Sequence, residues 1–126
     1  MDKHEFEKLV EEAVLDLPQK IRDKMDNVAV VVEDFSNPEQ LKKGGTRRGM
    51  LLLGLYEGVP QTKRGLGYTL VLPDKITIFQ KSIEQIARTD DEIKKAIRET
   101  VWHECAHHFG FDEDGVRKLT RKRNKK

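Results

Sequence analysis

Cysteine is nearly absent from this chain: Cys105 is the single one among 126 residues. A lone cysteine forms no intrachain disulfide, which excludes a disulfide-stapled secreted fold and a zinc ribbon that needs several cysteines. Long apolar runs are missing too. No stretch approaches the roughly 20 apolar residues that a membrane-spanning helix needs, and no apolar run follows the charged N-terminal residues, as it would in a signal peptide. We therefore expect a cytoplasmic protein without a membrane partner.

Charged residues are abundant and unevenly placed. They make up 37% of the chain, against roughly 25% in an average protein. Residues 117–126 hold seven of the 24 basic residues and no acidic one, which leaves 17 bases against 22 acids in residues 1–116. We predict one domain over residues 1–116, because the chain is too short for a second core of normal size, followed by a basic, mobile tail over residues 117–126. The tail is a weak nucleic-acid signal, because it adds charge without aromatic residues for base stacking.

Two helical regions are predicted from apolar spacing and from end signals. Apolar residues recur at three- and four-residue steps over residues 6–21, which is typical of one amphipathic stripe. Pro18 should end this helix and open a short second one, because proline lacks the backbone donor. Near the other end, Thr89 and Glu92 form a capping-box pattern. The helix that starts there should run to Gly110, a residue that favours a helix stop.

Three apolar segments between these helices predict strands at residues 28–32, 50–56 and 75–79. The first is rich in β-branched residues and continuously apolar, which favours a strand covered on both faces. Residues 57–68 contain four glycines or prolines and read as a surface loop. Residues 73–74 read as the turn before the third strand. The pattern predicts an α/β (α+β) fold with a small sheet.

The segment that carries chemistry is His103-Glu104-Cys105-Ala106-His107, which has the form H-E-x-x-H. His103 and His107 are four residues apart, so one helical turn directs both imidazoles to the same side, where they can bind one cation. Glu104 is rotated by about 100° from His103 and lies beside the metal. A carboxylate there can accept a proton from a water that the metal has acidified.

A third ligand is expected after the helix stop at Gly110. The metzincin pattern H-E-x-x-H-x-x-G-x-x-H places its last ligand at Glu113 in this chain. Two histidines and a carboxylate suit catalytic zinc and leave a fourth position for water. Asp112 and Asp114 flank Glu113, and either is an alternative for this ligand.

The chain resembles the bacterial minimal zincin-like metallopeptidases over nearly its whole length. The resemblance is carried by residues 26–34, 54–60, 73–79 and 103–110. It implies a compact zincin-like domain in which a small mixed sheet packs against the motif helix and an N-terminal helix. It also implies one Zn²⁺ per chain at His103 and His107, with Glu104 as general base. The family's third ligand is usually an aspartate at the position of Glu113, and glutamate there is one methylene longer.

The strand that ends at Tyr56 and Glu57 is a candidate for substrate binding. In zincin-like folds a sheet edge lies beside the metal and can pair with an extended peptide. In that interpretation Tyr56 lies near the reacting carbonyl. A packed strand with a tyrosine at its rim explains the same residues equally well.

We predict a zinc metallopeptidase that hydrolyses peptide or protein substrates. A metal-dependent endoribonuclease is the first alternative, because a family of ribosomal-RNA maturation endonucleases shares the H-x-x-x-H-x-x-G-x-x-H spacing. That family lacks the glutamate found here at Glu104, which disfavours this alternative. The second alternative is a binding protein in which zinc has only a structural role, because so small a domain has few residues to form a deep specificity cleft.

Overall fold

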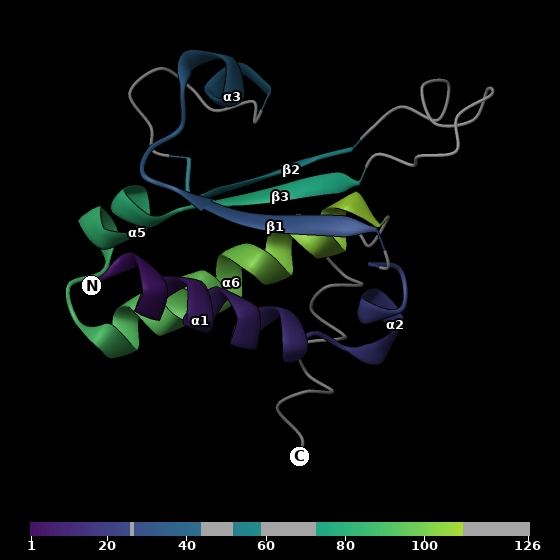
Figure 1. Cartoon of the computed structure of the whole chain (residues 1–126), viewed down its shortest axis with the longest axis horizontal. Helices are drawn as coiled ribbons and strands as arrows, with labels where there is room; N and C mark the ends of the chain where they lie inside the picture. The colour runs from purple at the N-terminus through teal and green to yellow at the C-terminus, as the bar shows by residue number, and fades with distance from the viewer. Residues whose placement is uncertain (26, 44–51, 59–72, 110–126) are drawn as a thin grey trace.

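The computed structural model describes residues 1–25, 27–43, 52–58 and 73–109, with only the backbone described at His107. Five helices and three strands lie in these ranges (Figure 1). In chain order the elements are α1 (Lys3–Leu15), α2 (Gln19–Arg22), β1 (Val28–Glu33), α3 (Pro38–Lys43), β2 (Gly54–Glu57), β3 (Asp74–Phe79), α5 (Gln80–Ile86) and α6 (Asp90–His108).

The strands form a mixed sheet in the order β1-β3-β2. β1 runs parallel to β3, with Val30 opposite Ile76, and β2 runs antiparallel to β3, with Tyr56 also opposite Ile76. Among the described strands, β2 therefore lies at one edge of the sheet. This arrangement matters for function because β2 is the strand nearest to the motif helix α6.

Helices α1 and α6 lie side by side against one face of the sheet (Figure 1). The apolar stripe predicted over residues 6–21 is confirmed, since Phe6, Val10 and Ile21 are all buried. They share one core with Ile97 and Val101 of α6 and with the apolar residues that β3 directs toward the helices. The predicted α+β domain, with a small mixed sheet packed against the motif helix and an N-terminal helix, is confirmed.

The prediction that the first strand is covered on both faces was wrong. β1 has no fully buried residue, and Val30 is 37% exposed. β1 is an edge strand of the described sheet, so its side chains have neighbouring side chains from another strand along one edge only. The strand buried on both faces is β3. Its Ile76 and Thr77 point to opposite faces, and both are completely buried.

Several element boundaries also differ from the prediction. The strand expected at residues 50–56 appears as β2 over Gly54–Glu57. Of the turn expected at residues 73–74, Asp74 is already the first residue of β3. Helices α3 and α5 were not predicted. The loop expected at 57–68 lies almost entirely outside the described residues, and the basic tail expected at 117–126 lies wholly outside them. None of the helices described is long and apolar enough to cross a membrane.

Candidate metal and catalytic site

The motif residues lie on the last two turns of α6. The predicted capping box starts this helix: the amide of Glu92 donates to Oγ1 of Thr89 at 3.1 Å. The helix then continues without interruption through His103, Glu104 and His107. His103 is exposed and Glu104 is partly buried. The two histidines are thus one turn apart on a regular helix, as the spacing predicts, while the His107 side chain lies outside the described part.

Glu104 is held by the neighbouring strand. Its Oε1 accepts a hydrogen bond from the backbone amide of Tyr56 in β2 at 3.0 Å. Amide groups alternate in direction along an antiparallel strand, so this is an amide that β2 directs away from β3. The bond orients the Glu104 carboxylate and ties the motif helix to the edge of the described sheet.

A groove of about 280 Å³ runs along α6 next to these residues. His103 and Glu104 form one end of it, and the start of β2 and the end of α5 form its walls. Most of its lining is apolar or small: Leu52, Leu53, Gly54, Ile86, Ala96 and Thr100, with Glu99 as a further acid. Ile86 is 54% exposed, so the groove presents apolar surface to solvent beside the motif.

Tyr56 lies next to Glu104 through its backbone, while its ring packs elsewhere. The ring stacks on His108, with ring centroids 3.6 Å apart and planes inclined by 16°. The hydroxyl of Tyr56 donates to Oδ2 of Asp74 at 3.1 Å, and the same oxygen lies 3.7 Å from Nε2 of His108. The structure therefore brings Tyr56 to the motif helix and occupies its hydroxyl with Asp74.

Glu57, the second residue predicted to bind substrate, forms an ion pair with Lys43 of α3. Its Oε2 lies 2.9 Å from Nζ of Lys43, and its side chain is 24% exposed. This hydrogen bond and the charge of Glu57 raise the pKa of Lys43. The pair connects α3 to β2, so the structure engages this carboxylate with a lysine of another element.

Cys105 is fully buried and is part of the hydrophobic core. Burial, with a smaller contribution from the charge of Glu104, raises the pKa of its thiol to about 12. Cys105 belongs to the core and does not line the groove beside His103, so we do not count it among the candidate metal ligands. Cys105 acts as a small core residue, in the same core cluster as Val101 and Ala106.

The candidate ligand set fits zinc in its chemistry, and only part of it is described. Imidazole nitrogens completed by a carboxylate are typical zinc donors, and His103 presents one such imidazole at the surface of α6. Glu113 and its alternatives Asp112 and Asp114 lie outside the described residues. Among the side chains within those ranges, no group of three or more His, Cys, Asp or Glu residues could hold a metal ion.

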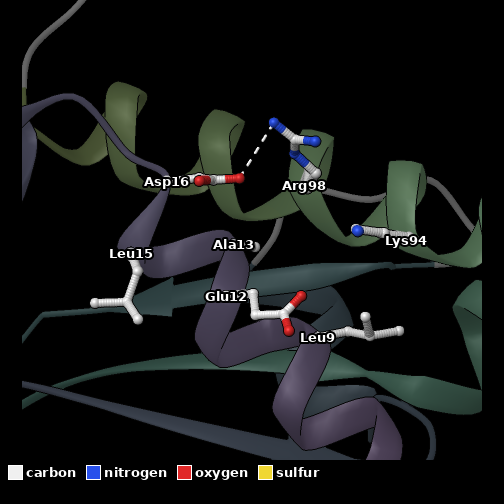
Figure 2. A pocket seen from close by; sticks show the side chains of 7 residues that line it. All are labelled: Leu9, Glu12, Ala13, Leu15, Asp16, Lys94 and Arg98. Carbon is white, nitrogen blue, oxygen red and sulfur yellow. Dashed lines mark ion pairs between the residues drawn. The ribbon is translucent and has the colours of Figure 1, made fainter.

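A second groove, between α1 and α6, lies on the side of α6 that faces away from β2. It measures about 330 Å³ and carries charges of both signs. Figure 2 shows Asp16, the residue that follows α1, directed at Arg98 of α6, with Lys94 one turn away. Oδ2 of Asp16 lies 3.2 Å from Nη2 of Arg98. These opposite charges neutralise each other across the helix interface, and His103 and Glu104 do not line this groove. We therefore place the candidate site at the groove beside β2.

Two residues that shape the site were not identified from the sequence. The sequence pattern predicts that Asp74 is part of a turn, whereas in the structure it contacts both Tyr56 and His108. The sequence pattern predicts that Gly54 is a strand residue and gives no sign of its close contact with α6, where a Cβ would lie 2.6 Å from Cγ2 of Thr100. Each role depends on partners that lie 18 or more residues away in the sequence, so no local spacing pattern predicts it.

Comparisons with known proteins agree with this architecture. Residues 25–122 match the model of a family described as zincin-like metallopeptidase. Among curated proteins, none matches the sequence. A solved structure of a conserved hypothetical protein from Thermus thermophilus is similar, with a TM-score of 0.57 and 23% identity, covering 86% of this chain and 94% of that chain. At this identity the similarity demonstrates a shared fold.

Proposed function

Because the chain belongs to the zincin-like metallopeptidase family, we propose that it is a zinc-dependent peptidase with Glu104 as general base. The observation that carries this proposal is the placement of His103 and Glu104 on one helix, beside an open groove and an edge strand. The family implies zinc, and the motif supplies residues of the right type to hold it and to move a proton.

His103 and His107 would hold the zinc ion together with Glu113, or with Asp112 or Asp114 in its place. Two imidazoles and one carboxylate leave a coordination position for water. When bound, zinc lowers the pKa of water and polarises the carbonyl of the scissile peptide bond. A site closed by four protein ligands would instead support the non-catalytic alternative, because it offers no such position.

Glu104 would carry the proton through the reaction. Its carboxylate accepts a proton from the water whose oxygen attacks the peptide carbonyl carbon. The carbon–nitrogen bond then breaks, and the same residue delivers the proton to the leaving amine nitrogen. The hydrogen bond from the amide of Tyr56 supports this role because it holds the carboxylate in one orientation, so less side-chain freedom is lost when substrate binds.

The groove beside His103 suits an extended peptide with a bulky apolar side chain. Its apolar lining includes Leu52 and Ala96, and Ile86 contributes surface that is exposed to solvent. An apolar side chain entering the groove would displace water from that surface, which favours binding in proportion to the apolar area removed from solvent. Glu99 at the groove wall would further favour peptides with a basic residue nearby.

Metal analysis and a peptide-library assay test this function together. Purified wild-type protein should contain about one zinc per chain, as expected for a mononuclear site, and His103→Ala should lose it. With zinc supplied, wild-type protein should cleave library peptides, and Glu104→Gln should reduce the rate by at least about a hundredfold. Equal cleavage by both proteins would show that Glu104 is not the base.

The same preparations separate the alternatives. Cleavage of RNA by the wild-type protein, with peptides left intact, would support the endoribonuclease and would leave the role of Glu104 unexplained. Tight zinc binding with neither activity would support the binding protein.

A further inference from the structure

Asp74 connects two residues that lie far from it in the sequence, Tyr56 in β2 and His108 at the end of α6. One oxygen of its carboxylate, Oδ2, accepts the Tyr56 hydroxyl at 3.1 Å and lies 3.7 Å from Nε2 of His108. The rings of Tyr56 and His108 stack at a centroid distance of 3.6 Å. Each of the three side chains therefore contacts the other two, although they come from three separate elements.

The surroundings favour a firm contact. The Asp74 side chain is only 14% exposed, and a carboxylate shielded from water is costly unless it is hydrogen-bonded. A hydrogen bond to an ionised group is also stronger than a neutral one. Gly58 leaves room for the cluster, since a Cβ at that position would lie 3.2 Å from Cε1 of His108.

We propose that Asp74, Tyr56 and His108 form a clamp that fixes the last turn of α6 against the sheet and so positions His107 for zinc. The inference rests on the zinc site of the proposed function. His108 directly follows His107, and α6 ends at His108. A contact that fixes His108 therefore also fixes the backbone of the preceding ligand and the direction in which the chain leaves the helix. Tyr56 and Asp74 are positioning residues in this scheme.

Two measurements on folded variants test the clamp. The first is hydrogen exchange of the backbone amides of residues 105–109 in metal-free protein, and the second is zinc affinity by competition with a chelator. Asp74→Ala should lower amide protection at least about tenfold. It should also weaken zinc binding by roughly 10- to 100-fold, as loss of contacts that orient ligands does. Tyr56→Phe, which keeps the ring stack and loses the hydroxyl, should show a smaller effect.

Two further variants separate positioning from general destabilisation. Asp74→Asn keeps an oxygen that accepts the Tyr56 hydroxyl and should recover part of the zinc affinity. Asp34→Ala removes a carboxylate that is 66% exposed and 3.7 Å from Lys81, and should change neither measurement. If Asp74→Ala fails to fold, the same two measurements on Tyr56→Phe test the clamp instead.

The outcomes are distinct. The clamp would be overturned if a folded Asp74→Ala protein kept the amide protection and the zinc affinity of wild type. If Asp74→Ala does not fold, the same result in Tyr56→Phe would overturn it. Weakened zinc binding with unchanged protection would also overturn it, because the effect would not pass through the last turn. A wild-type protein that takes up no zinc would overturn the proposed function, and the exchange measurement would then decide whether the clamp fixes the helix end.

Discussion

The backbone amide of Tyr56 donates a hydrogen bond to Oε1 of Glu104 at 3.0 Å, which joins residues 48 positions apart. Strand β2 and the motif helix are thus connected through the side chain that we assign as the general base. The same carboxylate has a structural role, in linking helix and sheet, and a proposed chemical role, in moving a proton. Different substitutions at Glu104 should separate the two.

Glu104→Ala should lower the free energy of unfolding by about 1 kcal/mol, because it removes the acceptor of the Tyr56 amide. Glu104→Gln should lower it clearly less, since the glutamine carbonyl oxygen still accepts this bond. Both should reduce the rate of peptide hydrolysis by at least about a hundredfold. Urea unfolding measures the difference, and Glu99→Ala, at an exposed position on the same helix, controls for the higher helix propensity of alanine. Equal stability of the alanine and glutamine variants would contradict the structural role.

Ile86 should determine which peptides bind in the groove. Ile86→Ser should lower kcat/KM roughly tenfold for a peptide whose bulky apolar residue fills the groove, and should have little effect on its alanine counterpart. The free energy of unfolding should change by less than about 0.5 kcal/mol, because Ile86 is 54% exposed. Leu15→Ser is a matched control, since Leu15 is 59% exposed and lies outside this groove. An equal loss for both peptides would place the groove outside the substrate path.

The contact between Gly54 and α6 should be sensitive to a single methyl group. In Gly54→Ala the new Cβ would lie 2.6 Å from Cγ2 of Thr100, so β2, α6 or the Thr100 side chain must shift. We expect a loss of roughly 1–3 kcal/mol in the free energy of unfolding, as for other overpacked sites. Chemical denaturation measures it.

Thr100→Ser provides the matched rescue. It removes Cγ2 and keeps the hydroxyl that donates to the carbonyl of Ala96 at 2.7 Å. The double variant Gly54→Ala, Thr100→Ser should therefore be more stable than the sum of the two single changes predicts, by about 0.5 kcal/mol or more. Strict additivity would mean that another contact, such as that with Ile78, causes the loss.

The sequence was sufficient for features that depend on local periodicity. The stripe of α1 and the capping box at Thr89 are short-range patterns, and all three predicted helices are present as α1, α2 and α6. The start of helix α3 also has a short-range sequence signal, Asn-x-x-Gln. Asn37 and Gln40 exchange side-chain to backbone hydrogen bonds of 2.9 and 2.7 Å, which is the geometry of a capping box.

Features that depend on tertiary contacts were not predictable in this way. Helix α5 begins with polar residues, Gln80 and Ser82, that are buried only because of the fold, and Nε2 of Gln80 donates to the carbonyl of Met1 at 2.8 Å. The exposure of β1 depends on which strand lies beside it. Asp74 acquires its partners through the register of β3 and the direction of α6, so its local sequence contains no indication of them.

Because the thiol of Cys105 is buried, the free energy of unfolding should be lower at alkaline pH than at neutral pH. Burial raises the pKa of its thiol to about 12, whereas an unfolded cysteine ionises near pH 8.5. Above about pH 8.5 the unfolded chain therefore loses a proton that the folded chain keeps, and the free energy of unfolding falls as pH rises until the folded thiol also ionises. The expected loss from this group is roughly 2 kcal/mol at pH 10.

Cys105→Ala isolates this contribution. The variant should be less stable than wild type at pH 7, because it leaves a small cavity in the core. Its free energy of unfolding should nevertheless decline less between pH 7.5 and 10, as measured by urea unfolding at both values. In parallel, a thiol reagent at pH 8 should modify wild-type protein only at the rate at which the chain opens, because the reactive thiolate is suppressed by burial. Fast modification of the folded protein, together with identical pH slopes for both proteins, would show that Cys105 is accessible, and its exclusion as a metal ligand would then have to be withdrawn.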